Sequence, residues 1–376
     1  MDEFYVIENL PVFIRNFQVK AYLWPQISPS LYRFLIRPVL FLFDPERIHR
    51  FTFFALRILF AFPLTGLIFR LLFKIRSEKL AREVFGIRFS NPVGLAAGFD
   101  KEGLIAEKWE NLGFGFAELG TVTPLPQVGN PPKRLFRLPE DKALINRMGF
   151  NNGGVEKMAE CLKKGRKGRI VIGGNIGKNK DTLNENALAD YVQTFNMLFP
   201  YVDYFVINVS SPNSPGLRDL QEKEPLKKLL LGIRADNEKQ KRPKPVLLKI
   251  SPDLTEGQID DILNVVSETG VAGIVAANST TDRSGLKTPE SVLDTIGAGG
   301  LTGAPILEKS IGLIRYISKK TGGKLPVIGV GGILSPDDAL RMLDAGASLI
   351  QVYTGFIYNG PGFARRICRA ILKGTE

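Results

Sequence analysis

The sequence predicts an α/β fold, a (β/α)8 TIM barrel that follows a small apolar helical pair. Eight short apolar runs rich in β-branched residues alternate with stretches of helical periodicity, and a region rich in Phe, Leu and Arg precedes them. Alternating strand and helix signals are typical of a parallel sheet covered by helices. Eight strands favour closure into a barrel. An open doubly wound sheet is the alternative.

Composition narrows the class of protein. The chain has 376 residues, a net charge of +12, one histidine and two cysteines, enough for one large domain with a small accessory segment. The basic excess contains no polybasic run, so an anionic membrane or substrate explains it as well as nucleic acid. Cys161 and Cys368 are far apart, which argues against a disulfide framework or a structural metal site. Because His49 is the only histidine in the sequence, a site built from several histidines is excluded.

Residues 1–30 form an N-terminal extension for which the sequence predicts no role. Asp2, Glu3 and Glu8 fit neither a secretory signal nor a mitochondrial presequence. Residues 31–79 follow as a separate, membrane-associating segment.

In that segment, "LYRFLIRPVLFLF" and "FTFFALRILFAFPLTGLIFRLLF" flank the polar turn signal "DPERIHR", which predicts two short apolar helices. Apolar helices with interspersed arginines are typical of segments that lie in the membrane interface, although packing on the main domain is the alternative. Arg57, Pro63 and Arg70 interrupt the apolar run, so no transmembrane helix is expected.

Residues 80–376 contain the predicted barrel. Its strands are expected in "NPVGLAA", "FGFAELGTVT", "RIVIGGNIG", "YFVINVSS", "PVLLKIS", "GIVAANS", "PVIGVGGI" and "LIQVYTG", which begin at residues 91, 114, 169, 204, 245, 273, 326 and 349. Helix signals separate them. After the seventh strand, Ser335 can cap a helix, Pro336 can occupy its first turn and Gly346 can end it.

Polar residues or glycines stand where most of these runs stop, and the active site of such a barrel lies at the carboxyl ends of its strands. A single one is commonly a turn residue, but a whole ring is harder to explain in that way. The ring comprises Lys101, Thr121, Asn175, Asn208, Ser211, Lys249, Asn278, Ser279, Gly331, Gly332, Tyr353 and Thr354.

The chemistry of these side chains favours a planar, polar ligand. The amides of Asn146, Asn175, Asn208, Asn213 and Asn278 suit a heterocycle with alternating carbonyl and N–H groups, which is a flavin, a pyrimidine or both.

Two lysines and two glycine-rich segments extend this prediction. Lys101 and Lys249 can supply positive charge to a carboxylate and to a reduced flavin. The alternative is that both are surface lysines, but the apolar context "VLLKIS" argues against a surface position for Lys249. The segments "GGLTG" and "GVGGI" allow backbone N–H groups to approach a phosphate, as near the last strands of many barrels. FMN fits this pattern. The chain lacks the motifs of a Rossmann dinucleotide site and of a P-loop.

From residue 31 to the C-terminus the chain resembles the dihydroorotate dehydrogenases. The resemblance rests on "NPVGLAAGFDKEG", "GFGFAELGTVTPLPQVGNPPKRLFRLPEDKALINRMGFNN", "NIGKNK", "INVSSPNSPGLRDLQ" and "VIGVGG". "DPERIHRFTF" within apolar helices and the serine in "NVSSPNS" are similar to class 2, the membrane-associated, quinone-reducing branch. Class 1 enzymes are soluble, lack these helices and use a cysteine base.

The resemblance implies one noncovalent FMN per chain and the oxidation of (S)-dihydroorotate to orotate in pyrimidine biosynthesis, with a membrane quinone (ubiquinone or menaquinone) as acceptor. Ser211 would remove the C5 proton while the C6 hydride passes to the flavin. A serine needs activation for this role, and a water with the Ser214 hydroxyl is our hypothesis for the relay. Implied substrate ligands are Lys101, Asn146, Arg147, Met148, Gly149, Phe150, Asn208, Asn213, Asn278 and Ser279.

The same resemblance implies residues for the cofactor and for the quinone. The quinone tunnel between the N-terminal helices would reach His49, Arg137 and Tyr353. Ser214, Ala277 and Thr302 depart from the usual family residues, and we expect them to tune rates. The implied FMN ligands are Ala96, Ala97, Gly120, Thr121, Asn175, Asn208, Lys249, Ala277, Thr302, Gly303, Gly331, Gly332, Tyr353 and Thr354.

Three other readings are weaker. A soluble class 1 enzyme using fumarate or NAD would carry a cysteine at Ser211, and a flavin-dependent RNA-modifying barrel would carry a cysteine at a strand end. A catalytically inactive membrane protein would have a disrupted site. We therefore expect a monomer without nucleic-acid partners, peripheral on the cytoplasmic face of a bacterial inner membrane, with the mitochondrial inner membrane as the alternative.

Overall fold

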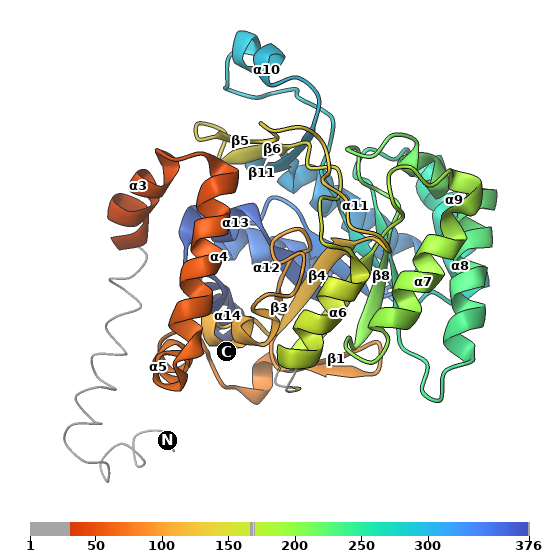
Figure 1. The fold of residues 1–376 in the computed structure, drawn as a ribbon, viewed down its shortest axis with the longest axis horizontal. Coiled ribbons are helices and arrows are strands. Elements are labelled where there is room, and N and C mark those ends of the chain that lie inside the picture. Colours follow the sequence, from red (N-terminus) through yellow and green to blue (C-terminus); the bar gives the residue numbers. More distant parts are fainter. Residues whose placement is uncertain (1–30, 166–167, 169, 375–376) are drawn as a thin grey trace.

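The computed structural model describes residues 31–165, 168 and 170–374, so the predicted N-terminal extension 1–30 lies outside the described residues. Its centre is a closed barrel of eight parallel strands that neighbour one another in chain order (Figure 1). Each of the eight apolar runs supplies one strand, which confirms the predicted barrel. The strands are β3 (Val93–Leu95), β4 (Phe116–Val122), β7 (Val171–Ile176), β8 (Tyr204–Asn208), β9 (Val246–Ile250), β10 (Gly273–Ala276), β12 (Val327–Val330) and β13 (Leu349–Val352).

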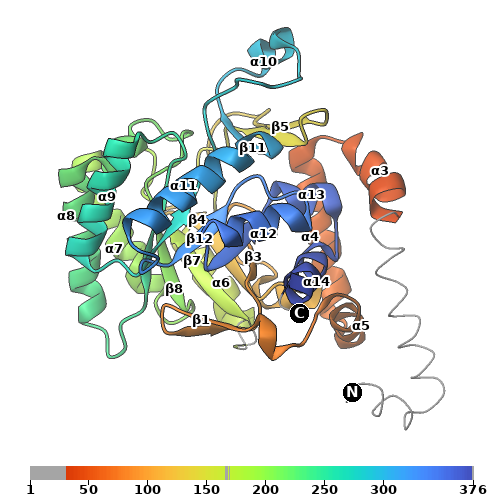
Figure 2. The same ribbon diagram turned by 180° about the vertical axis from the view of Figure 1, so that it is seen from behind.

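Helices surround the barrel, as the ribbon shows from both sides (Figures 1 and 2). The predicted start of α12 is confirmed: Ser335 caps the helix, Pro336 is its first residue, and Ser335 and Asp338 form a reciprocal capping box. The barrel helices are α6 (Gly154–Gly165), α7 (Ala187–Leu198), α8 (Lys223–Glu238), α9 (Glu256–Thr269), α11 (Leu307–Lys320), α12 (Pro336–Asp344), α13 (Thr354–Asn359) and α14 (Phe363–Gly374). Short 3-10 turns are η2 (Glu78–Leu80), η3 (Ala106–Leu112), η4 (Asn184–Asn186), η5 (Leu217–Gln221) and η6 (Ala304–Ile306).

The two ends of the barrel are closed differently. At the amino end, the hairpin β1 (Arg82–Val84) and β2 (Ile87–Phe89) places the Phe89 ring 5.2 Å from that of Phe116, inside the barrel. At the carboxyl end, β5 (Leu135–Leu138), β6 (Ala143–Asn146) and β11 (Gly300–Gly303) form an antiparallel sheet, and α10 (Glu290–Ile296) projects beyond it (Figure 1). This antiparallel sheet was not predicted from the sequence.

The expected apolar helices are present, but their boundaries differ from the prediction. They are η1 (Tyr32–Ile36) with α3 (Arg37–Phe41), α4 (Pro45–Ala61) and α5 (Pro63–Phe73). The polar motif is the first turn of α4, because the Asp44 carboxylate accepts hydrogen bonds from the backbone N–H of Glu46 and Arg47. A second break at Pro63 bends α5 by 106° from α4, since proline favours the first turn of a new helix.

These helices present an apolar surface. Of the large apolar side chains that are exposed in the described residues, fourteen lie between Leu31 and Leu71 and five lie elsewhere. None of the described helices is by itself long and apolar enough to cross a membrane, whereas the bent pair α4–α5 satisfies the length and composition criteria jointly. The division of the chain at residue 79 stays a prediction.

Candidate active site

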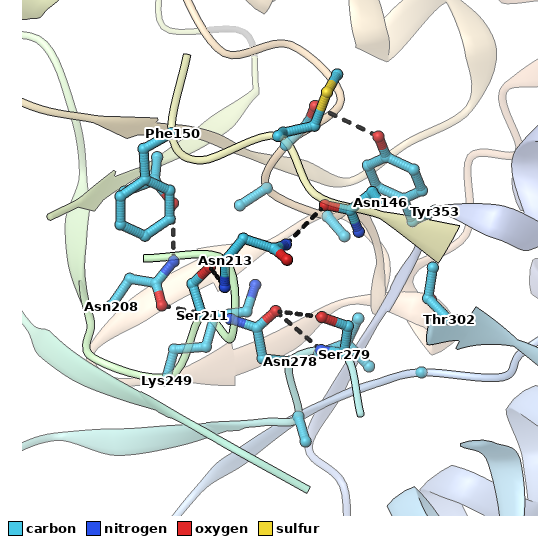
Figure 3. A pocket seen from close by; sticks show the side chains of 18 of the residues that line it. Asn146, Phe150, Asn208, Ser211, Asn213, Lys249, Asn278, Ser279, Thr302 and Tyr353 are labelled. Carbon is cyan, nitrogen blue, oxygen red and sulfur yellow. Dashed lines mark hydrogen bonds between the residues drawn. The ribbon is translucent and has the colours of Figure 1, made fainter. Parts of the chain in front are cut away.

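A polar cavity of about 860 Å³ opens at the carboxyl ends of the barrel strands (Figure 3). It is the region that the ring of strand-end residues predicted. Three wall residues were not anticipated: Gly98, Ile306 and Val330. The predicted residues in its wall are Ala96, Ala97, Lys101, Thr121, Asn146, Met148, Gly149, Phe150, Asn208, Ser211, Asn213, Lys249, Ala277, Asn278, Ser279, Thr302, Gly331 and Tyr353.

The remaining predicted residues lie behind or beside this wall. Asn175 is fully buried behind it, and the Thr354 hydroxyl lies 3.3 Å from that of Thr302. Gly120, Gly303 and Gly332 are also outside the wall residues.

Arg147 is a predicted substrate ligand that is not among the wall residues of the polar cavity. Its guanidinium donates hydrogen bonds to the carbonyl oxygens of Ile296 and Ala298 and lies 4.9 Å from the centre of the Phe136 ring. These contacts fix the segment before β11. The Arg147 side chain is therefore not proposed as a ligand. Its backbone lies next to Asn146, but its long side chain points away from the polar cavity toward these contacts.

The asparagine side chains of the ring contact one another. The Asn208 amide donates to the Thr121 hydroxyl at 2.8 Å, and the Asn213 amide donates to the side-chain oxygen of Asn146 at 3.0 Å. The Asn278 amide donates to the Ser210 hydroxyl at 3.0 Å. Hydrogen bonds within the set reduce the side-chain freedom lost on ligand binding, so the site is preorganised.

Ser211 lies on the loop after β8 with 5% of its surface exposed, and its hydroxyl accepts a hydrogen bond of 3.3 Å from the Asn213 N–H. Arg218 holds this loop. Its guanidinium donates to the carbonyl oxygens of Ser210 at 3.2 Å and of Ser279 at 3.0 Å, and pairs with Asp253 at 3.0 Å. The loop after β8 is thus tied to the loop after β10, a role that the sequence analysis missed.

The proposed relay through Ser214 stays a prediction. In the part of the chain that the structure describes, no direct hydrogen bond joins the hydroxyls of Ser211 and Ser214.

The two lysines of the polar cavity have different surroundings. Burial, together with the nearby Arg134 guanidinium, lowers the pKa of Lys101 to about 8, and its ammonium donates to the Asn151 side chain. Lys249 is buried and donates to the Glu118 carboxylate at 3.1 Å. Lys101 is therefore mostly charged at neutral pH and is the ammonium placed to meet an anionic group in the cavity.

A second, mainly apolar cavity of about 1470 Å³ lies between the N-terminal helices and the barrel. The three predicted tunnel residues His49, Arg137 and Tyr353 line it, and Tyr353 also lines the polar cavity. Burial lowers the pKa of His49 to about 4, with the positive charge of Lys101 as a smaller cause. The imidazole is thus neutral at physiological pH.

Two arginines attach the N-terminal helices to the barrel. Arg137 donates to the carbonyl oxygens of Phe41 at 3.2 Å and Phe43 at 2.8 Å, and lies 4.5 Å from the Phe41 ring centre. Arg134 binds Glu46 of α4 through two hydrogen bonds of 2.8 and 3.0 Å, which holds the pKa of that carboxyl below its usual value. The roof of the apolar cavity is therefore fixed by polar contacts at its edge.

The fold and the site define a (β/α)8 barrel whose strand ends form a cavity suited to a planar, polar ligand, next to an apolar cavity. Comparison with known proteins gives the family. Residues 79–374 match the family model described as dihydroorotate dehydrogenase, and the chain belongs to this family.

Two curated relatives carry the name dihydroorotate dehydrogenase (quinone). The Christiangramia forsetii protein is 53% identical over 343 residues, which cover 91% of this chain and 99% of the relative. The Chloroflexus aurantiacus protein is 50% identical over 353 residues, covering 92% and 97%. These matches confirm the predicted family and enzyme class.

Comparison with a solved structure supports the same family. The dihydroorotate dehydrogenase of Eimeria tenella in complex with ferulenol superimposes with a TM-score of 0.79 at 35% identity, over 88% of this chain and 91% of that one. Membership of this family implies a flavin cofactor.

Proposed function

We propose that this chain oxidises (S)-dihydroorotate to orotate and passes two electrons, through bound FMN, to a membrane quinone in pyrimidine biosynthesis. The dehydrogenase reaction follows from the family. The quinone as acceptor is supported by one observation above all: the polar cavity and the apolar cavity share Tyr353 as a common wall.

The polar cavity fits FMN. Consecutive glycines Gly331 and Gly332 have φ of +121° and +86°, and a Cβ on them would lie 2.6 Å from the Ser310 oxygen and 2.4 Å from the Leu307 Cα. Only glycine fits there, and left-handed glycine backbone beside a cavity is suited to phosphate. The hydroxyls of Thr302 and Thr354 would complete the phosphate site.

The flavin ring would lie among the remaining cofactor residues. When bound, FMN would supply the capacity to take two electrons from one reactant and release them to another. Its polar edge would meet the amides and the Lys249 ammonium. The residues proposed for it are Ala96, Ala97, Gly120, Thr121, Asn175, Asn208, Lys249, Ala277, Gly303 and Tyr353.

Dihydroorotate would occupy the part of the cavity nearest Ser211. Lys101 would pair with its carboxylate, because this ammonium lines the polar cavity and its hydrogen-bond partner, the Asn151 side chain, is neutral. Hydrogen bonds to the ring would fix its orientation, and Phe150 with Met148 would exclude water from the base. The ring ligands proposed are Asn146, Gly149, Asn208, Asn213, Asn278 and Ser279.

Ser211 would remove the C5 proton. The Arg218 contacts hold the loop that carries it, and the Asn213 N–H that already donates to its oxygen would stabilise the negative charge that develops as the hydroxyl is deprotonated. Deprotonation would use a water and, by our hypothesis, the Ser214 hydroxyl.

The apolar cavity would take the quinone, and the exposed apolar face of residues 31–71 would rest on the membrane from which the quinone comes. We propose peripheral attachment to the cytoplasmic face of a bacterial inner membrane and a monomeric state.

Co-flotation with lipid vesicles tests the attachment. The protein should float with the vesicles, whereas a variant with charged residues at Phe34, Leu42 and Phe54 should not.

The acceptor is tested by following orotate formation with detergent-purified protein. We expect turnover with a short-chain ubiquinone and with menadione, and none with fumarate or NAD as the sole acceptor. Turnover with fumarate or NAD but not with quinones would contradict the assignment of the apolar cavity and favour a class 1 type of reaction. The structure gives that alternative no support, because neither Cys161 nor Cys368 is a wall residue of the polar cavity.

A further inference from the structure

Glu118 is a charged residue in the middle of β4, and the proposed function does not use it. Its side chain is fully buried inside the barrel. One oxygen accepts hydrogen bonds from the Asn175 amide at 2.7 Å and the Lys249 ammonium at 3.1 Å, and the other accepts from the Gln351 amide at 2.6 Å. A buried carboxylate is costly unless it is paired and fully hydrogen-bonded, so this arrangement needs a reason.

The hydrogen bonds continue from Glu118 toward the substrate side of the polar cavity. The Asn208 amide donates to the side-chain oxygen of Asn175 at 3.3 Å, and the Asn278 amide donates to the side-chain oxygen of Asn208 at 3.4 Å. The backbone N–H of Ser279 donates to the side-chain oxygen of Asn278 at 2.8 Å. Figure 3 shows Asn208, Asn278 and Ser279 of this series of hydrogen bonds at the cavity wall. Every amide donates toward Glu118 and presents its oxygen to the next residue.

The direction of this chain follows from the chemistry of its last acceptor. An ionised carboxylate can only accept hydrogen bonds, whereas an asparagine amide has a donor end and an acceptor end. The carboxylate therefore requires the N–H₂ end of Asn175 to face it, which sets the orientation of Asn208 and then of Asn278. These orientations decide which groups the amides offer to a ligand in the cavity.

The same carboxylate also balances the charge of Lys249. The ammonium is buried beside the cavity and Glu118 is its only carboxylate within ion-pair distance in the described residues. Without this negative charge, the uncompensated ammonium would stabilise negative charge on a group bound in the cavity, because the attraction is screened little in a buried site.

We propose that Glu118 is a positioning residue that orients the asparagine chain and, through Lys249, sets the reduction potential of the flavin. This inference rests on the proposed function, in that FMN and orotate are the ligands of the polar cavity.

The variant Glu118→Gln separates charge from orientation. The glutamine oxygen can still accept from Asn175. Its N–H₂ can donate to the side-chain oxygen of Gln351, which has no partner within the described structure, once the Gln351 amide turns over, because its N–H₂ faces Glu118 in the wild type. In the FMN-loaded variant we expect the equilibrium between oxidised and reduced flavin to shift about tenfold toward the reduced form, roughly 30 mV for a two-electron couple. The dissociation constant of orotate should change by less than about twofold, because the amide chain is retained.

The variant Glu118→Met removes the acceptor as well as the charge. We expect the same direction of change in potential and, in addition, a roughly tenfold weaker binding of orotate, because the Asn175 donor loses its buried partner. Gln351→Met is the packing control: it alters the same interior layer and removes one neutral donor to Glu118, but it keeps the negative charge and the Asn175 hydrogen bond. Both quantities should therefore lie much closer to those of the wild type than to those of the Glu118 variants. Thermal melts check that all three proteins fold.

A wild-type potential in Glu118→Gln would overturn the charge role, and wild-type orotate affinity in Glu118→Met would overturn the orientation role. Equal shifts in Gln351→Met would also overturn the proposal, since they would reflect packing alone. Failure of the proposed function has a different signature: the wild-type protein would then bind neither FMN nor orotate.

Discussion

The two cavities on either side of Tyr353 are built in different ways. The polar cavity is lined at the ends of barrel strands by side chains that bind one another, so its shape and its hydrogen-bonding groups are fixed before a ligand arrives. The apolar cavity lies beneath helices that are held mainly by apolar packing and by a few polar contacts at the edge. The first suits a small polar substrate of one defined shape, and the second suits a flexible, lipid-soluble one.

The largest effect should follow from Ser211→Ala, which changes the polar cavity alone. Loss of the base should slow the reduction of the flavin by dihydroorotate by about a thousandfold, as general bases contribute on the order of 10² to 10⁴. Stopped-flow absorbance measures this step, and the reoxidation of chemically reduced enzyme by quinone should stay at the wild-type rate. Ser211→Cys should recover part of the loss. An equal loss in both steps would mean that Ser211 supports the structure and not the chemistry.

Arg134→Ala should have the next largest effect, on the attachment of the helices over the apolar cavity. It leaves the Glu46 carboxylate with only the longer contact to the exposed Arg50, at a site where the side chains of Arg134 and Glu46 are largely buried, so the free energy of unfolding should fall by about 3 kcal/mol. Urea unfolding measures it. Arg50→Ala is the control, because Arg50 contacts the same carboxylate at 3.6 Å with 72% of its side chain exposed and such pairs contribute about 0 to 1 kcal/mol. Equal losses would remove any special role of Arg134.

Thr52→Phe tests the apolar cavity from within. The added ring would fill part of the space lined by α4 that the quinone would occupy, so reoxidation of the flavin by quinone should slow roughly tenfold, which corresponds to about 1.4 kcal/mol. Reduction by dihydroorotate should not change. Ile58→Phe adds volume on the exposed side of the same helix and should leave both steps unaltered. A Thr52→Phe variant with normal quinone reoxidation would place the acceptor elsewhere.

The smallest expected effect is a pH dependence of orotate binding in the polar cavity. Because burial lowers the pKa of Lys101 to about 8, the ammonium is present below this pH and is lost as pH rises through it. The dissociation constant of orotate should therefore increase roughly fourfold between pH 7 and 8.5. Isothermal titration across this range measures the change. Lys101→Arg keeps its charge and should show a flat profile; the same increase in that variant would assign the effect to another group.

The sequence predicted the polar cavity well because most of its polar residues stand at or just after the end of a strand. Once eight strands close into a barrel, Asn208 and Lys249 can only meet at its carboxyl end. Glu118 and Arg218 were missed because neither stands at a strand end: one is a single charge inside an apolar run, and the other acts through backbone carbonyls of two loops. The charge within "FGFAELG" was the available signal.

The helical region was predicted less accurately. Its apolar composition is evident from the sequence, but the position of its breaks depends on local capping by Asp44 and on Pro63, and a turn signal can also begin a helix. Side-chain direction was the other limit, as Arg147 shows: a long side chain next to a site residue can leave the site to bind carbonyl groups.

Simultaneous occupation of the two cavities by two different ligands is the main expectation from this structure. It is tested most directly by titrating FMN-loaded protein with orotate in the absence and in the presence of a saturating, redox-inactive quinone analogue. The account predicts the same dissociation constant for orotate, within about twofold, because the sites share only a wall. A dissociation constant that rises in proportion to the analogue concentration would show that both ligands compete for one cavity and would contradict it.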